Sequence, residues 1–371
     1  MNILVLALPA VAGWGGSEEL WADTARVALN DGHCVWITPR IDDSGNDSRL
    51  RELVSLGAVL ISRERFRSGG GPQEVEVVPN AAYEVVRSVD AILLSAGGSM
   101  RELIDPAVLR LIEVSRPTPL IVTVRLVSER DLLTDTERER ARAVLQLLSG
   151  VVLPAQRSRE ILERVLASQI PQTTIVPSPI RRDLPGVLPW PMTTTARFAC
   201  VARLSPIQKG QDLLLEAFAS PRWYGRDWHL TFVGRGAGRN YLEELVKHYA
   251  LTDRVTFAGF QEKVTDVWSD NELLILPSRE ESMPIAVLEA MYCGRPCLVT
   301  DVGDNTKFVR AGDTGFVAHG ARLAALSHAL QTAWESRPCW PEMGRRAHSL
   351  YMQIRDPSPG RTVLSLLLSA N

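Results

Sequence analysis

Residues 273–300 read "LLILPSREESMPIAVLEAMYCGRPCLVT" and predict a strand, a loop, a helix and a second strand. The runs "LLILPS" and "PCLVT" are apolar without alternation, which is typical of strands buried on both faces of a parallel sheet. Pro284 suits the first turn of the helix between them. Glu281 lies in the loop and Glu289 lies more than one turn inside the helix, so two carboxylates are expected near the carboxyl edge of this sheet.

The same alternation of apolar runs and helical stretches covers the whole chain. The strand-like runs of the first half are "NILVLAL", "CVWITP", "AVLIS", "AILLSA", "LIVTV", "GVVLP" and "TTIVPS", and those of the second half are "RFACVARL", "HLTFVGR", "VTFAGF", "LLILPS" and "PCLVTD". Buried strands that alternate with helices predict parallel sheets covered by helices. We therefore expect an α/β protein with two Rossmann-like domains that face each other across a cleft.

A proline-rich stretch, "PSPIRRDLPGVLPWPMTTT", separates the two halves. Proline removes a backbone donor and favours extended neighbours, so this stretch reads as a linker. The sequence predicts a first domain over residues 1–180, a linker over 181–196 and a second domain over 197–356.

Composition excludes several classes of protein. A net charge of -2 over 371 residues argues against a protein that coats nucleic acid. The five cysteines are scattered and complete no metal-binding set, which favours reduced thiols and no metal site. The apolar start "MNILVLAL" lacks a basic leader, and no run is long enough to span a membrane, so we expect a cytoplasmic protein with at most peripheral membrane association.

Glycines follow the first predicted strand, in "GWGGSEE". Gly15 and Gly16 allow close backbone approach to a ligand, and the helix that starts here is suited to bind an anion. The pattern is not GxGxxG, so a nicotinamide site is weakly supported. An ordinary strand-to-helix turn explains the two glycines equally well.

Two cations follow the first strand of the second half, in "VARLSPIQKGQ". Arg203 and Lys209 flank a strand-to-helix loop and are placed to bind a diphosphate, although such a pair alone is common on protein surfaces. Gly234 follows the next strand, and Phe260 follows the one after it, where an aromatic edge can meet a nucleotide base. Both also fit ordinary turns.

Glu281 and Glu289 are spaced to hold two polyols on either side of such a diphosphate, for example a sugar and a ribose. The alternative is a helix-capping carboxylate and a solvated helix residue. The apolar neighbours in "PIAVLEAM" make this alternative less favourable, because a carboxylate among them needs a partner.

From residue 197 to 318 the chain resembles the retaining nucleotide-sugar glycosyltransferases of family 4, which have the GT-B fold. The resemblance rests on "ARLSPIQKG", "FVGRGAG", "VTFAGF", "PSREESMPIAVLEAMYCGRPCLVTDVG" and "AGDTGFVA". It is looser in the first half, at "GGSEELW" and "DGHCVWIT". It implies that the first domain binds the acceptor, that the second binds the donor, and that residues 357–371 form a helix that packs back on the first domain.

The resemblance also implies roles for single residues. Arg203 and Lys209 match the cations that bind the donor diphosphate, Glu289 matches the acid that holds the ribose, and Glu281 matches the acid that contacts the donor sugar. We expect catalysis to depend on Arg203, Lys209 and Glu281. The wider donor site predicted here consists of Gly15, Gly16, Arg203, Lys209, Gly234, Phe260, Glu281, Met283, Pro284, Ile285 and Glu289.

Met283, Pro284 and Ile285 match a turn whose amides approach the sugar and the distal phosphate. This chain has Ser282 and Met283 where some members have Gly-Phe, a change that bears on sugar preference. Gly16 matches a glycine that closes onto the diphosphate.

The acceptor side is expected to include Glu18, Trp21 and Arg125. Many family members have a histidine near the end of the strand "LIVTV", where this chain has Arg125. The alternate arginines of "SRERFRSGGG" (Arg63, Arg65 and Arg67) fit a solvated strand edge better than a surface for lipid or an anionic acceptor.

The expected function is transfer of a hexose-type sugar from a nucleotide-diphosphate sugar to an unknown acceptor, with retention and without a metal ion. That acceptor is a glycan, a lipid-linked intermediate or a small natural product. The alternatives are a nucleotide-sugar-binding protein without turnover, which the missing histidine keeps open, and a nucleotide-sugar epimerase of the same fold.

Overall fold

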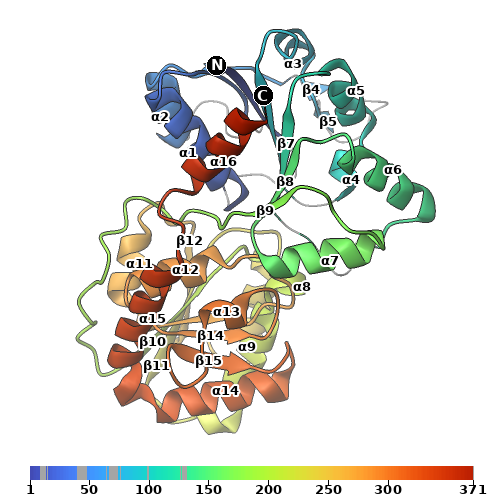
Figure 1. Cartoon of the computed structure of the whole chain (residues 1–371). Coiled ribbons are helices and arrows are strands. Elements are labelled where there is room, and N and C mark those ends of the chain that lie inside the picture. The colour runs from blue at the N-terminus through green and yellow to red at the C-terminus, as the bar shows by residue number, and fades with distance from the viewer. Residues whose placement is uncertain are drawn as a thin grey trace. The chain divides into compact units, whose positions relative to one another are not determined.

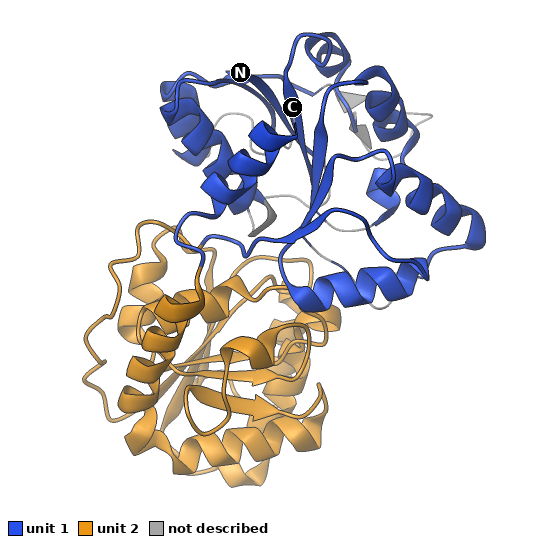
Figure 2. Cartoon of the chain, in the orientation of Figure 1, with its two compact units in different colours: residues 1–179, 356–371 blue, residues 180–355 orange. Residues whose placement is uncertain are grey.

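The computed structural model describes residues 1–8, 14, 16–39, 48–63, 65–66, 74–75, 77–97, 100–125, 127 and 132–370. The chain divides into two compact units (Figure 2). Unit 1 comprises residues 1–179 and 356–371, and unit 2 comprises residues 180–355.

The described strands of unit 1 form a parallel sheet in the order β3-β2-β1-β6-β7-β8-β9. Its strands are β1 (Asn2–Ala7), β2 (Cys34–Thr38), β3 (Val59–Leu60), β6 (Ala91–Ala96), β7 (Leu120–Val124), β8 (Gly150–Leu153) and β9 (Thr173–Ile175). A separate antiparallel pair consists of β4 (Arg65–Phe66) and β5 (Glu74–Val75). Each of the seven apolar runs predicted for this half contributes a strand to the parallel sheet.

Helices cover both faces of this sheet. They are α1 (Gly16–Asn30), α2 (Ser48–Ser55), α3 (Asn80–Val85), α4 (Met100–Leu103), α5 (Pro106–Val114), α6 (Asp135–Leu145), α7 (Gln156–Leu166) and α16 (Pro359–Ser369). Successive residues of β1 enter opposite cores, with Ile3 and Val5 packed towards α1 and α16 and Leu4 and Leu6 packed towards α3 to α7.

The last helix packs on the first one, and both belong to unit 1. Figure 1 shows α16 in red beside α1 in blue. The amide of Gly360 donates to Asp23 Oδ2 over 2.9 Å. A Cβ atom at Gly360 would lie 2.6 Å from the carbonyl carbon of Asp23, so only glycine permits this approach.

All residues of unit 2 are described, and its sheet has the order β12-β11-β10-β13-β14-β15 with every neighbouring pair parallel. The strands are β10 (Ala196–Val201), β11 (Trp228–Val233), β12 (Val255–Gly259), β13 (Leu273–Leu276), β14 (Cys297–Thr300) and β15 (Gly315–Ala318). The strand order reverses between β10 and β13. The five apolar runs predicted for this half are all strands, whereas β15 was not predicted.

The helices of unit 2 are α8 (Pro206–Lys209), α9 (Gln211–Phe218), α10 (Arg239–His248), α11 (Val264–Asp270), α12 (Ile285–Tyr292), α13 (Asn305–Phe308), α14 (Leu323–Glu335) and α15 (Trp340–Ile354), with 3-10 turns at Pro221–Trp223 and Arg337–Cys339. They bury both faces of the sheet, because Phe198 and Ala199 of β10 enter different cores. The predicted α/β class with two parallel-sheet domains is confirmed.

The proline-rich segment predicted as a linker lies within unit 2 and is packed against it. The guanidinium of Arg295, 1% exposed, donates to the carbonyls of Leu188 and Pro189 over 3.2 and 2.6 Å. Trp190 Nε1 donates to Glu272 Oε1 over 3.2 Å. The two contacts of Arg295 satisfy carbonyls of the proline-rich segment, which is not part of a sheet.

Among the described residues, no helix is both long and apolar enough to cross a membrane.

Candidate functional site

The carboxyl edge of the unit 2 sheet is the place where a ligand is expected. In parallel α/β sheets, ligands bind beyond the carboxyl ends of the strands, at the point where the strand order reverses. That point lies between β10 and β13. Arg203 and Lys209 follow the first of these strands, and Glu281 follows the second.

Lys209 and Glu281 join the loops that follow the two strands. Lys209 Nζ lies 2.6 Å from Glu281 Oε1, and the hydroxyl of Ser278 donates to the same oxygen over 2.9 Å. The Lys209 side chain is 21% exposed and that of Glu281 is 7% exposed. The ammonium therefore stays within reach of an incoming anion while its carboxylate partner is almost covered.

Backbone and side-chain hydrogen bonds also join the segments that follow β10 and β13. The amide of Arg279 donates to Gln208 O over 2.7 Å, and its guanidinium binds both oxygens of Asp212 over 2.6 and 2.9 Å. Gly210 has φ +65°, and a Cβ atom there would lie 2.0 Å from Pro277 O. Lys209 is thus held next to a rigid junction, which lowers the entropy lost on binding a ligand.

Glu289 lies one turn into α12 and is 4% exposed. Among its partners is Arg181, whose Nε lies 3.7 Å from Glu289 Oε1. The structure therefore places this acid among apolar residues with a cation nearby. A solvated helix residue, the alternative left open by the sequence, is excluded by its burial.

The turn before α12 differs from the prediction. The helix begins at Ile285, so Pro284 precedes it and does not lie in its first turn. Pro284 has no amide hydrogen, and the amide of Ile285 donates to Met283 O over 3.1 Å. Two of the three residues expected to present amides to a ligand therefore do not offer them.

Arg203 and Gly234 lie side by side at the sheet edge. The Arg203 side chain is exposed, and its carbonyl accepts from Gln211 Nε2 over 2.7 Å. Gly234 has φ +140°, and a Cβ atom there would lie 2.0 Å from Ala202 O. Close approach of these two loops therefore explains the glycine without a ligand.

Phe260 follows β12 and is flanked by cations. The guanidinium carbons of Arg181 and Arg235 each lie 5.5 Å from the centroid of its ring. The ring is half-buried, so part of it remains available to a planar partner.

In unit 1 the structure brings Glu18 and Arg125 together. Arg125 follows β7 and is 7% exposed, and Glu18, in the first turn of α1, is 1% exposed. Burial lowers the pKa of Arg125 to about 10, and the negative charge of Glu18 partly offsets this effect. Arg125 Nη1 also donates to Val176 O over 3.4 Å. Both residues are largely covered by protein.

Other predictions for unit 1 are corrected or fall outside the described residues. Trp21 is 1% exposed and belongs to the hydrophobic core, with its ring centroid 5.4 Å from that of Trp14, so it does not suit the expected acceptor surface. Gly16 begins α1, and Gly15 lies outside the described residues.

Arg63 does not lie on a solvated strand edge. Its guanidinium donates to the carbonyls of Pro39, Val77 and Ala7, so it joins the end of β1, the residue after β2 and the segment before α3. Arg65 is the first residue of β4, and Arg67 lies outside the described residues.

The described residues contain no cluster of three or more His, Cys, Asp or Glu side chains placed to hold a metal ion. Cys200, Cys293 and Cys297 are buried thiols. Burial raises the pKa of Cys200 and of Cys293 to about 12, so neither is a ready thiolate nucleophile.

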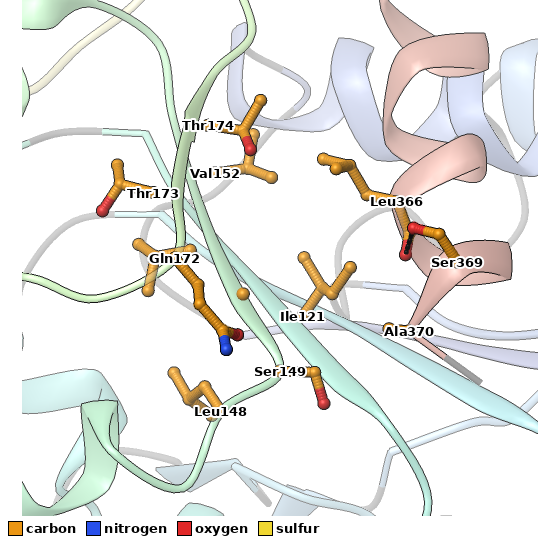
Figure 3. A pocket seen from close by; sticks show the side chains of 12 residues that line it. Ile121, Leu148, Ser149, Val152, Gln172, Thr173, Thr174, Leu366, Ser369 and Ala370 are labelled. Atoms are coloured by element: carbon orange, nitrogen blue, oxygen red, sulfur yellow. Dashed lines mark hydrogen bonds between the residues drawn. The ribbon is translucent and has the colours of Figure 1, made fainter.

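A recess of about 550 Å³ lies in unit 1 (Figure 3). Ser149 and Gln172 line it just before β8 and β9, and Leu366 and Ser369 of α16 close its other side. It therefore lies at the amino edge of the sheet, opposite the edge where ligands bind in this architecture.

The sequence did not identify three residues that lie at the candidate site: Arg181, Ser278 and Asp212. Arg181 lies in the proline-rich segment, which carries no periodicity that points to a site. Ser278 is the last residue of the predicted run "LLILPS", two residues after the end of β13, and this position is the one signal that identifies it.

Comparisons with known proteins agree with this geometry. Residues 195–336 match the sequence profile of the family described as "Glycosyl transferases group 1". This match lies within unit 2. Over 126 residues the chain is 36% identical to the alpha-D-kanosaminyltransferase of Streptomyces kanamyceticus, covering 33% of each chain. It is 35% identical over 131 residues to the N-acetyl-alpha-D-glucosaminyl L-malate synthase of Bacillus anthracis, covering 35% of this chain and 34% of that one.

These matches span about a third of the length of each relative. The fold is similar over the whole chain to that of Anabaena Alr3699/HepE, solved with UDP and glucose, with a TM-score of 0.77, 17% identity and 99% of each chain covered. It is also similar to sucrose-phosphate synthase from Thermosynechococcus elongatus, with a TM-score of 0.72 and 18% identity over 100% of this chain and 99% of that one. The segment that matches the group 1 glycosyltransferases is thus part of a GT-B fold, as predicted.

Proposed function

We propose that this protein is a retaining glycosyltransferase that moves a hexose-type sugar from a nucleotide-diphosphate sugar to an acceptor without a metal ion. The observation that carries the proposal is the contact of Lys209 with Glu281, which joins the loops after β10 and β13 where the strand order reverses. This is the position at which the architecture binds nucleotides.

The cations of this edge act on the diphosphate. Departure of a nucleoside diphosphate requires stabilisation of the negative charge that develops on its leaving oxygen. The exposed Arg203 and the ammonium of Lys209 supply that stabilisation, and the amino end of α12 adds its dipole. Glu281 and Ser278 hold Lys209 in place before the donor arrives.

The carboxylates bind hydroxyl groups. The two described contacts of Glu281 use Oε1, so Oε2 is the oxygen offered to a hydroxyl of the donor sugar. Glu289 accepts from the ribose diol, and Phe260 meets the base. In this scheme neither acid forms a bond to the sugar, which distinguishes the pair from the carboxylates of a glycosidase.

The transfer breaks the bond between the anomeric carbon and the diphosphate oxygen. The acceptor hydroxyl attacks from the face that the nucleotide leaves, and its proton passes to the departing phosphate. The anomeric configuration is retained, and no covalent enzyme intermediate forms.

The substrates are proposed at the level of class. UDP is bound in the Anabaena structures, and the relatives include a D-inositol 3-phosphate glycosyltransferase of Rhodococcus erythropolis, 33% identical over 141 residues. We therefore place a uridine diphosphate sugar first among donors and a soluble polyol or glycan first among acceptors. The protein acts in the cytoplasm, with at most peripheral membrane contact, and needs no nucleic acid partner.

A second candidate is a nucleotide-sugar-binding protein without turnover. It is favoured by the buried Arg125, within the electrostatic influence of Glu18, at the position where many family members have a histidine. The donor site is the same in both candidates, so turnover decides between them.

The test is thermal unfolding with UDP-, GDP-, ADP- and TDP-sugars, followed by measurement of nucleotide release. At a donor concentration of about 100 times Kd, the wild type gains about 2.7 kcal/mol of stability. Glu289→Ala and Glu289→Gln are expected to lose this gain relative to their own ligand-free stability, and the surface control Glu244→Ala keeps it. Stabilisation without nucleotide release supports the binding protein. If no donor stabilises the wild type, the site is misplaced.

A further inference from the structure

Arg181 fixes the loop that follows β12. Its Nη1 donates to the carbonyls of Gln261 and Glu262 over 3.1 and 2.5 Å, and its guanidinium carbon lies 5.5 Å from the centroid of the Phe260 ring. The side chain is only 17% exposed. A planar guanidinium can hold two carbonyls and lie against a ring at once, which an ammonium cannot do.

The same side chain reaches Glu289 on α12. The separation of 3.7 Å between Arg181 Nε and Glu289 Oε1 is too long for a hydrogen bond and short enough for an ion pair. The cation therefore offsets part of the cost of burying the carboxylate.

We propose that Arg181 is a positioning residue that couples the base end of the nucleotide site to its ribose end. It holds the loop of Phe260 at a fixed distance from Glu289, so that a base and a ribose diol can be bound together. This inference rests on the proposed function, because it takes Glu289 as the ribose-binding acid. Arg181 itself does not touch the reacting atoms.

The coupling makes a prediction that separates positioning from a general structural role. If Arg181 acts through Glu289, its removal weakens the binding of ligands that carry the ribose diol more than the binding of ligands that lack it. If it merely keeps unit 2 folded, its removal weakens all nucleotides equally. A cycle that combines a protein substitution with a ligand change measures the difference.

The experiment compares UDP with 2′,3′-dideoxy-UDP on the full chain by calorimetric titration, after a screen of UDP, GDP and ADP on the wild type identifies the base. If the screen favours another base, its diphosphate and its dideoxy form replace the uridine pair. Arg181→Gln is expected to weaken the ribonucleotide about tenfold and the dideoxy form less than about twofold. Arg181→Lys keeps the charge and is expected to recover part of the loss. The neighbouring exposed arginine provides the control, Arg182→Gln.

The outcomes are distinct. Equal weakening of both ligands, or no weakening of either, overturns the positioning role while the nucleotide site stands. Failure of every nucleotide to bind the wild type overturns both the proposed function and this inference. Thermal unfolding of each variant without ligand identifies a loss of folding, and Arg181→Lys then serves as the test variant.

Discussion

Unit 1 and unit 2 both contain a parallel sheet with helices on each face, yet charged residues at their carboxyl edges are placed differently. In unit 2 Lys209 is 21% exposed on its side chain and is held by Glu281. In unit 1 Arg125 is 7% exposed as a whole residue and faces Glu18, which is 1% exposed. One cation is open to a ligand, and the other is enclosed by protein.

The difference in exposure indicates that the cation in unit 2 is placed to meet a ligand, whereas the cation in unit 1 is placed to interact with the protein around it. An exposed charge held by a buried partner costs little to maintain and interacts strongly with an incoming anion. A buried charge interacts mainly with its protein surroundings, and its removal withdraws compensation from the opposite charge buried near it. Substitutions in unit 2 should therefore change turnover more than stability, and substitutions in unit 1 should do the reverse.

The largest effect is expected for Lys209→Ala. Under the proposed function, loss of a cation that stabilises the leaving diphosphate should lower kcat/KM by about 10² to 10³. The effect on the free energy of unfolding should be smaller, because Glu281 keeps its hydrogen bond from Ser278. Steady-state kinetics and urea unfolding measure the two quantities. The exposed Lys247→Ala serves as the matched control. A variant that loses stability instead of rate would erase the contrast between the units.

The next effect is expected for Arg125→Met, a substitution of similar length without charge. It leaves Glu18 buried beside an apolar side chain and should destabilise unit 1 by about 3 kcal/mol. Urea unfolding is the measurement, and Arg87→Met, at an exposed position of the same unit, is the control. Unchanged stability with a loss of acceptor turnover would instead give Arg125 the acceptor-side role that the sequence suggested.

The smallest effect concerns Glu137, which bridges α4 and α6 in unit 1. A hydrogen bond from Arg101, together with one from the amide of Thr134, lowers the pKa of Glu137 to about 2. Because this folded-state pKa lies below the ordinary value, its contribution to stability is complete above about pH 4.5 and disappears as the pH falls towards about 2. Glu137→Gln should therefore lower the melting temperature at neutral pH and converge with the wild type in acid.

The control for this comparison is Glu139→Gln, an exposed position on the same helix. Melting curves at several pH values give the difference between wild type and variant. A difference that does not shrink in acid would mean that the carboxylate charge is not the cause.

Much of this fold could be predicted because its strands are buried on both faces. The runs around Ile3 and Leu274 are continuously apolar, and such runs have few alternatives to a central parallel strand. The positions of Lys209 and Glu281 followed from the same logic, since residues that come directly after neighbouring parallel strands must meet at one edge.

The surroundings of several other residues could not be predicted, because they depend on contacts between segments that are distant in the sequence. Arg181 is separated from Glu289 by more than half of unit 2, and no local pattern indicates that they meet. Trp21 was expected to line the acceptor side, but its position on α1 places it in the hydrophobic core. Arg63 looked like part of a charged edge, although the carbonyls it binds come from three separate segments.

The packing of α16 on α1 has a consequence for how the protein is made. The bond from Gly360 to Asp23 joins residues 337 positions apart, and unit 2 lies entirely between them. A ribosome therefore finishes unit 2 before it delivers the helix that completes unit 1, and the apolar face of α1 has to wait uncovered during that interval. Unit 1 is begun before unit 2 and finished after it, so its early apolar surface is where a nascent chain would most need a chaperone.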